Sequence, residues 1–225
     1  MSTWAEWICQ FQQDLKLDVR LPRGVEVLNP YTDPTVRAIC QTFYHRYYAD
    51  SGPRTLIMGI NPGRFGGGVT GVPFTDPIAL TSLDIPHSLA PRQELSSAFV
   101  YAVIEAFGGA APFFAQFYIS SVSPLGFTKA GKNLNYYDDP KLPQVLRKFM
   151  LYSLQTQLDW GLRREACFCL GEGENFKFLK KLNQEHHFFD EVIPLPHPRF
   201  VMQYRRKQLP EYVLRYTELL KSHVQ

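Results

Sequence analysis

Four short apolar runs, each bounded by turn residues, alternate along the chain with longer amphipathic segments. The runs are TLIMGI at 55–60, FYISSV at 117–122, ACFCLG at 166–171 and EVIPL at 191–195. Short, nearly continuous apolar runs of this kind are typical of strands that are buried on both faces of a sheet. The pattern therefore predicts four strands of one central sheet.

The segments around these runs have helical periodicity. The first is PRQELSSAFVYAVIEAFGG, which begins with a proline, keeps an apolar stripe and stops at Gly108. The same helical pattern is found in two later segments, KLPQVLRKFMLYSLQTQLDWG and ENFKFLKKLNQ. Further helices are expected near residues 3–14, 33–48 and 203–221.

Alternation of strands and helices predicts an α/β fold, a three-layer αβα sandwich around a mostly parallel four-stranded sheet. We expect a single domain over residues 1–225, with the N-terminal helices of residues 1–50 packed on the core. In such sheets ligands gather at the carboxyl ends of the strands. Three of the predicted strands are followed by the segments NPGRFGGG, SPLGFTKAGKN and PHPRF. The sequence therefore predicts that these segments lie together on one rim, at the carboxyl edge of the sheet.

Charge is distributed unevenly along a nearly neutral chain. The formal net charge is only +3, from 24 basic and 21 acidic residues, and indicates no particular partner. However, residues 51–75, 119–137 and 192–210 contain no Asp or Glu and hold eight basic residues: Arg54, Arg64, Lys129, Lys132, Arg199, Arg205, Arg206 and Lys207. If these segments converge, they form a positive surface suited to phosphate.

Cysteine and hydropathy patterns exclude several classes of protein. The four cysteines form no CxxC pair, and Cys167 and Cys169 fall on one face of a predicted strand, as small core residues do. They predict no metal site. No apolar run approaches the roughly 18 to 20 residues that span a bilayer, and the N-terminus has no basic segment before an apolar one. We therefore expect a cytoplasmic, bacterial-type protein without a membrane partner.

The stretch LIMGINPGRFGGGVTGVPFTDP, residues 56–77, places five glycines after the first predicted strand. It contains neither GxxxxGK[ST] nor GxGxxG, which argues against a nucleotide triphosphate site. Asn61 either stabilises its own turn or holds a water molecule. Phe74 is either a core residue or a stacking platform for a planar ligand. Asp76 is either a base or the cap of a helix.

A second stretch of interest is PLPHPRFVMQYRRK. His197 stands between two prolines that restrict its backbone, so its imidazole is positioned to donate an N–H to charge on a ligand. Phe200, Val201 and Met202 follow in an apparent loop before three basic residues. Such an arrangement is either an apolar wedge for a base stack or a hydrophobic staple at the start of the last helix.

Together these motifs resemble those of the uracil-DNA glycosylase superfamily, and most closely its single-strand-selective monofunctional group. GINPGRFGGGVTGVPF is similar to that group's first motif, G-M-N-P-G-P-F-G followed by T-G-V-P-F, with the spacing from Asn61 to Phe74 unchanged. PHPR resembles a shortened second motif, and SPLGFTKAGKNL resembles the segment between them. The resemblance covers residues of about 55 to 210.

The resemblance implies a DNA glycosylase of base excision repair that flips the target nucleotide and leaves an abasic site. It implies a monomer that needs no metal or organic cofactor and whose partner is DNA. Asn61 would position the attacking water, and His197 would hydrogen-bond the base carbonyl oxygen as catalytic residues.

The resemblance also implies two sets of binding residues. The base would be held by Gly59, Ile60, Gly63, Gly67, Phe74 and Ser121, with Phe74 stacked on it and the backbones of Gly63 and Gly67 against it. Residues 199–206 would be the loop that wedges into the duplex. DNA contacts would come from Arg64, Lys129, Lys132, Arg199, Phe200, Arg205, Arg206 and Lys207.

Ser121 is the main departure from the group's pattern, which has an asparagine there to read the uracil edge. A hydroxyl makes one contact fewer than an amide. The pocket is therefore expected to accept xanthine or hypoxanthine as well as uracil, unless Asn133 or Asn135 reaches the base instead. The alternatives are a catalytically weak protein that binds damaged DNA on the same scaffold, and a hydrolase of free nucleosides.

Overall fold

The computed structural model describes residues 2–224 and contains a four-stranded sheet in the order β3-β2-β6-β7. The strands are β2 Arg54–Gly59, β3 Phe117–Ser121, β6 Leu162–Leu170 and β7 Glu191–Leu195. Every neighbouring pair is parallel. The predicted parallel sheet and its four strands are confirmed, although β6 begins at Leu162, earlier than the sequence pattern indicated.

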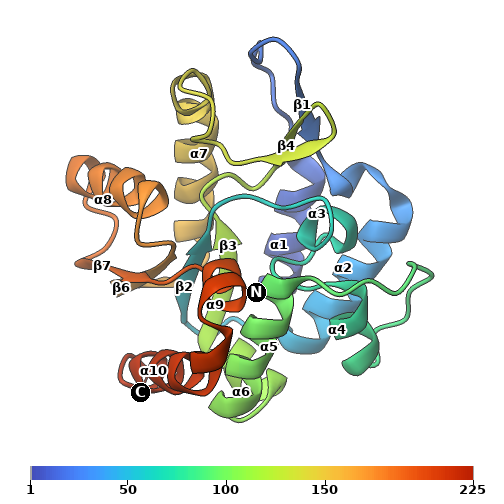
Figure 1. Ribbon diagram of the computed structural model, residues 1–225, viewed down its shortest axis with the longest axis vertical. Helices are drawn as coiled ribbons and strands as arrows, with labels where there is room; N and C mark the ends of the chain where they lie inside the picture. Colours follow the sequence, from blue (N-terminus) through green and yellow to red (C-terminus); the bar gives the residue numbers. More distant parts are fainter. Residues whose placement is uncertain (1, 225) are drawn as a thin grey trace.

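Helices cover both faces of this sheet (Figure 1). The longer ones are α1 Trp4–Asp14, α2 Pro34–Tyr47, α5 Leu95–Phe107, α7 Leu142–Leu158, α8 Glu174–His186 and α10 Leu209–Lys221. The shorter ones are η1 Pro30–Thr32, α3 Gly67–Thr70, α4 Pro77–Ser82, α6 Ala110–Gln116, α9 Pro198–Tyr204 and η2 Arg206–Gln208. None of the helices in the described part of the chain is by itself long and apolar enough to cross a membrane.

The core has two layers of side chains, one on each face of the sheet. On one face Tyr118 packs against Trp4 of α1 and Trp160 beyond α7, with ring centroids 5.4 and 6.0 Å away. On the other face Phe117 contacts Phe107 of α5 and Phe168 of β6. Apart from the partly buried Phe107, these side chains are buried, which confirms the three-layer αβα architecture.

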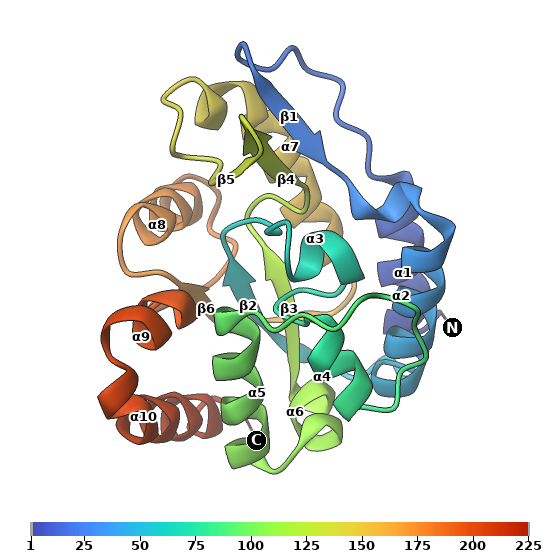
Figure 2. The ribbon, with the colours of Figure 1, turned by 45° about the vertical axis from the view of Figure 1, so that its right-hand side comes forward.

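A second, three-stranded antiparallel sheet lies beyond the carboxyl ends of β2 and β3 (Figures 1 and 2). It consists of β1 Val25–Leu28, β4 Gly126–Lys129 and β5 Lys132–Leu134. These strands are only three or four residues long and mix apolar and polar positions, so the search for continuous apolar runs did not predict them. The sheet holds the segment SPLGFTKAGKN close to the loop that follows β2.

The prediction of one continuous last helix near residues 203–221 is wrong. The chain instead forms α9, the single turn η2, and α10. Pro198 starts α9 and Pro210 lies in the first turn of α10. Proline suits the first turn of a helix but cannot continue one, so the two prolines fix separate starts.

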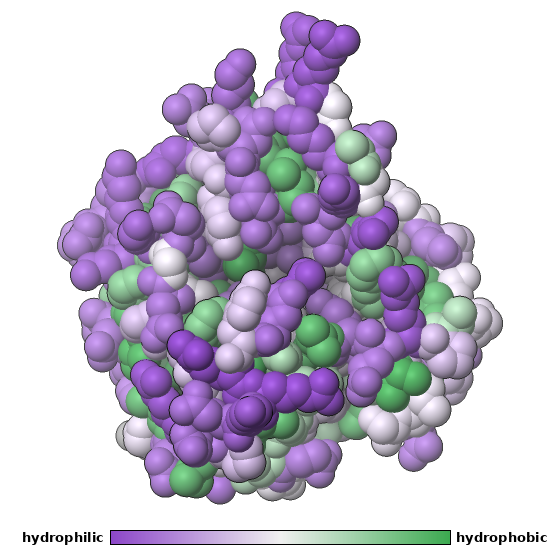
Figure 3. Space-filling model, in the orientation of Figure 1, coloured by the Kyte–Doolittle hydropathy of each residue, from purple (hydrophilic) through white to green (hydrophobic). Residues whose placement is uncertain are grey.

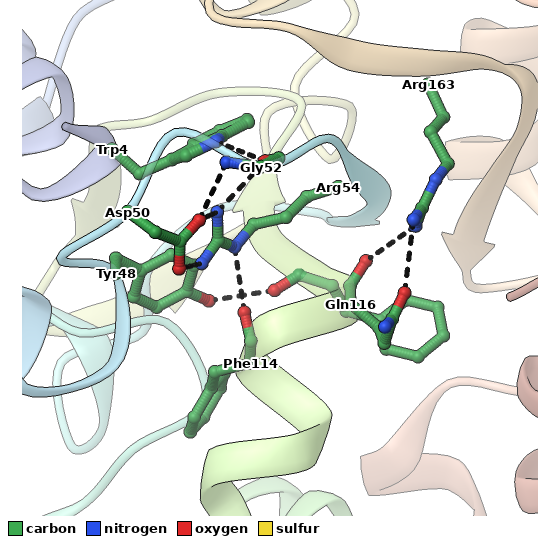
Figure 4. A network of polar contacts seen from close by, with 9 residues as sticks. Trp4, Tyr48, Asp50, Gly52, Arg54, Phe114, Gln116 and Arg163 are labelled. Carbon is green, nitrogen blue, oxygen red and sulfur yellow. Dashed lines mark hydrogen bonds and ion pairs between the residues drawn. The ribbon is translucent and has the colours of Figure 1, made fainter. Parts of the chain in front are cut away.

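Arg54 does not belong to the positive rim that the acid-free segments predicted. It lies at the amino end of β2, fully buried, where its guanidinium pairs with Asp50 at 2.8 Å and donates to the carbonyl oxygen of Phe114 (Figure 4). The rings of Trp4 and Tyr48 lie within 5.2 and 4.8 Å of it. This network closes the opposite end of the sheet from the rim. Arg54 is therefore a structural residue.

Candidate active site

A cavity of about 480 Å³ opens at the carboxyl ends of all four parallel strands. Its lining includes Ile60 and Asn61 after β2, Ser121 at the end of β3, residues 171–175 after β6, and His197 after β7. In the orientation of Figure 1, Figure 3 shows a hollow near the middle of the face, surrounded mostly by hydrophilic side chains. The predicted convergence of the three glycine- and proline-rich segments on one rim is confirmed.

Asn61 is held between two parts of the chain. Its side-chain oxygen accepts the backbone N–H of Tyr136 at 2.9 Å, and its amide nitrogen donates to the carbonyl oxygen of Leu134 at 3.2 Å. Both contacts come from the segment at and after β5. Asn61 therefore does more than stabilise its own turn, because the small sheet fixes its amide at the edge of the cavity.

Phe74 lines the cavity in a strained conformation. Its φ of 52° is in the left-handed region, which is uncommon for an aromatic residue. The ring lies so close to Gly59 that a Cβ there would be 2.7 Å from the Phe74 Cε2. Gly59 itself is buried and does not line the cavity. The base contact that the resemblance implied for Gly59 is therefore wrong: this glycine makes room for the Phe74 ring and does not face the cavity.

The other glycines of this loop have a similar explanation. A Cβ on Gly63 would meet the Asn133 amide at 3.3 Å, and one on Gly67 would meet the Val72 carbonyl oxygen at 3.2 Å. At Gly68 the nearest backbone atom would be only 2.6 Å away. Gly63 and Gly67 do line the cavity. The missing side chains at Gly63 and Gly67 leave room for the Asn133 amide and the Val72 carbonyl group, and the contact of the two backbones with a base stays a prediction.

His197 is the N-cap of α9, and its Nδ1 accepts the backbone N–H of Arg199 at 3.2 Å. When Nδ1 is an acceptor in a neutral imidazole, the proton is on Nε2. Burial, with a smaller contribution from the charge of Arg199, lowers the pKa of His197 to about 4. The ring centroid is 6.1 Å from that of Phe74. The site thus has a neutral N–H donor next to an aromatic platform.

This assignment predicts the titration of His197. In nitrogen NMR of the unliganded protein, His197 is expected as the neutral Nε2–H tautomer at pH 6, titrating near the pKa of about 4. Because folding lowers this pKa from 6.5, the native state loses stability relative to the unfolded state as pH falls from 6.5 toward 4. A charged imidazolium at pH 6 would contradict the assignment.

Ser121 is buried and lines the cavity at the end of β3. Asn133 and Asn135 line it too, but both are engaged elsewhere: Asn133 accepts the N–H of Arg64 at 3.0 Å, and Asn135 donates to Asp138. Asn175, which the sequence analysis missed, is fully buried and donates to the carbonyl oxygens of Gly59 and Leu170. It joins the ends of β2 and β6 beneath the cavity.

The predicted wedge, residues 199–206, is not a loop. Most of it forms α9, in which Val201 and Met202 are buried in the core. Phe200 and Tyr204, one helical turn apart, remain 41% and 65% exposed and line the cavity with their rings 5.5 Å apart. The exposed aromatic surface beside the cavity is therefore this pair, and the i, i+4 spacing of the two aromatics could have indicated it.

The predicted DNA-binding side chains, apart from Phe200, are basic and exposed. They are Arg64, Lys129, Lys132, Arg199, Arg205, Arg206 and Lys207. Lys129 is paired with Asp139 at 3.4 Å. Arg92, missed in the sequence analysis, lies over the ring of Phe65 at 3.5 Å, and Arg64 lies over the same ring at 4.3 Å. One aromatic ring thus holds two guanidinium groups near the cavity.

Asp76 is a structural residue. One carboxylate oxygen accepts the N–H of Ala79 at 2.8 Å as the N-cap of α4, and the other accepts the N–H of Glu94 at 2.6 Å. Of the two alternatives for Asp76, the helix cap is confirmed. Asp76 does not line the cavity, whereas Glu94, whose N–H it accepts, does.

Comparisons with known proteins identify a family and a similar solved structure. The family model of the uracil DNA glycosylase superfamily matches residues 45–221. A crystal structure of wild-type SMUG2 from Pedobacter heparinus is 45% identical, with a TM-score of 0.96, and the alignment covers 99% of this chain and 98% of that one. No curated protein sequence gives a match.

Proposed function

Because the chain belongs to the uracil DNA glycosylase superfamily, we propose that it hydrolyses the N-glycosidic bond of uracil in DNA and leaves an abasic site for base excision repair. Xanthine and hypoxanthine are proposed as further substrates. The observation that carries the proposal is the neutral His197 donor next to Phe74 in a cavity at the strand ends.

The geometry supports a simple course of reaction. The target nucleotide leaves the stack and its base enters the cavity, because the glycosidic bond cannot be reached inside a duplex. Phe74 stacks on the base, and Nε2–H of His197 donates to the base carbonyl oxygen, where negative charge develops as the bond breaks. A neutral donor suits this task, since the anionic base leaves without first being protonated. Asn61 orients the water that attacks C1′.

Ser121 gives the base edge one hydroxyl contact where the group's pattern has an amide. A hydroxyl can donate to a carbonyl or accept from an N–H, so it does not select one ring pattern strictly. This supports a broader substrate range. The experiment that tests the function is a single-turnover assay on oligonucleotides that contain uracil, xanthine or hypoxanthine, in single and double strands. An alkali-labile site is expected with uracil at least, and its absence with all three bases would reject the proposal.

We propose that Phe200 wedges into the duplex from α9. Phe200→Ala is expected to lower the rate on double-stranded uracil DNA about 5- to 150-fold, corresponding to ~1–3 kcal/mol of lost stacking. The rate on single strands should change less, because no duplex has to be opened. Tyr152→Ala, which removes an exposed aromatic from α7, is the matched control. Equal losses on both kinds of DNA would argue against a wedge.

Arg205, Arg206 and Lys207 are proposed to hold the phosphate backbone. Changing all three to glutamine is expected to weaken DNA binding for every sequence and to make the salt dependence shallower, by roughly 2–3 in the slope of log K against log salt. Binding titrations from low to moderate salt measure this. Unchanged slopes, together with turnover of free deoxyuridine, would favour a nucleoside hydrolase.

A further inference from the structure

The proposed reaction needs a group that takes a proton from the attacking water, and Asn61 cannot do this. A neutral amide orients water but is not a base at physiological pH. In addition, both ends of the Asn61 amide already form a hydrogen bond to the backbone at or just after β5. Any proton acceptor must therefore be another side chain of the cavity.

Glu94 is the carboxylate best placed for this role. Three acidic residues line the cavity, Glu94, Glu172 and Glu174. Glu172 and Glu174 are exposed, and Glu174 is paired with Lys177 at 2.8 Å. Glu94 is half-buried, and within residues 2–224 its carboxylate forms no ion pair. The negative charge of Glu94 is thus not neutralised by an ion pair with a neighbouring side chain of the described chain.

The fold holds Glu94 against the loop that carries Asn61. Glu94 is the N-cap residue of α5, and its backbone N–H donates to Asp76 at 2.6 Å. The carboxylate packs so closely on Gly66 that a Cβ there would collide with its Oε2. Gly66 therefore leaves space for this carboxylate, just as Gly59 leaves space for the ring of Phe74.

The electrostatic surroundings make Glu94 a better base than an exposed glutamate. Burial, and then the negative charge of Asp76 from α4, raise the pKa of Glu94 above its ordinary value. Arg199 from α9 and the Ser96 hydroxyl on α5 lower it by less. A carboxylate with a raised pKa binds a proton from water more readily.

We propose that Glu94 is a catalytic carboxylate that accepts the proton of the attacking water; this inference rests on the proposed function. The water oxygen forms a bond to C1′ while the C1′–N bond breaks, and that electron pair leaves with the base as an anion that His197 stabilises. One water proton goes to Glu94, and the product sugar keeps the hydroxyl. Glu94 then returns the proton to the released base or to solvent. Until the proton moves, its negative charge also stabilises the positive sugar ring.

Glu94→Gln tests this step, since glutamine keeps the size of the side chain and removes its basicity. In single-turnover cleavage of uracil DNA, the rate is expected to fall about 10²-fold. Affinity for a non-hydrolysable 2′-fluoro substrate and the midpoint of thermal unfolding should stay close to those of the unaltered protein. Glu105→Gln, an exposed position near the other end of α5, is the control.

Two further readouts separate a base from a structural residue. The rate of the unaltered protein should fall at acidic pH as Glu94 becomes protonated. The pH–rate profile of Glu94→Gln should lack this acidic limb. Added formate should restore part of the rate of Glu94→Ala, because a free carboxylate can enter the vacated space.

A Glu94→Gln rate within about threefold of the unaltered protein would overturn the inference. The inference would also be overturned if Glu94→Gln were slow but still lost rate at acidic pH, and formate failed to restore the rate of Glu94→Ala. If the unaltered protein cleaves none of the three bases, the proposed function fails, and this inference with it.

Discussion

His197→Ala is expected to release uracil about 10²–10³-fold more slowly than the unaltered protein. Removing a single donor to a developing anion costs ~2.7–4 kcal/mol of transition-state stabilisation. The structure gives the reason in this chain: Nδ1 of His197 accepts the N–H of Arg199, so the proton on Nε2 remains for the ligand. Single-turnover cleavage of uracil DNA measures the effect.

The control must separate catalysis from folding, because His197 also caps α9. His197→Asn keeps a residue that caps helices well, and it should be nearly as slow while preserving the helix. His87→Ala is a matched control, since the Nδ1 of His87 likewise accepts a backbone N–H two residues on, at 3.2 Å, on an exposed segment. Rates for both His197 variants within threefold of the unaltered protein would show that the donor is misassigned.

Asn61→Ala is expected to slow the reaction about 10²-fold. Small misplacements of a reacting group cost about this much, and the attacking water would lose the amide that orients it. The substitution also removes two hydrogen bonds to the backbone at and just after β5, at 2.9 and 3.2 Å. Rate and thermal stability must therefore be measured together.

Asn183→Ala provides the comparison for Asn61. Asn183 also joins two backbone groups through its amide, both on Phe189, with distances of 2.8 and 2.9 Å, and neither residue lines the cavity. It should lose comparable stability but no catalytic rate. If Asn61→Ala loses only stability, Asn61 is a structural residue and the water is held elsewhere.

The sequence predicted the parts of the site that depend on short stretches of chain. Continuous apolar runs identified the strands, and the turns after them carry Asn61, Phe74 and His197, so a parallel sheet had to bring these residues to one edge. The superfamily predicted from the motifs is confirmed by the family match, and the resemblance to its single-strand-selective group by the SMUG2 structure.

Features that depend on distant contacts could not be predicted in this way. The small sheet pairs β1 with β4 across about a hundred residues, and each of these strands is only four residues long. The absence of acidic residues from the segment 51–75 suggested a place for Arg54 on the positive rim, but Arg54 lies at the amino end of β2, away from that rim. Prolines before and after His197 indicated a loop, although Pro198 in fact starts a helix. Glu94 was missed because only the packing of α5 on the loop after β2 brings it to the cavity.

The most direct test of the central claim is the mass of the products from a single-stranded uracil oligonucleotide. Hydrolysis at the proposed site predicts free uracil and an otherwise intact strand that carries a hydroxyl at C1′, with both products formed much more slowly by His197→Ala. A strand that keeps its uracil, or equal release of uracil by both proteins, would contradict it.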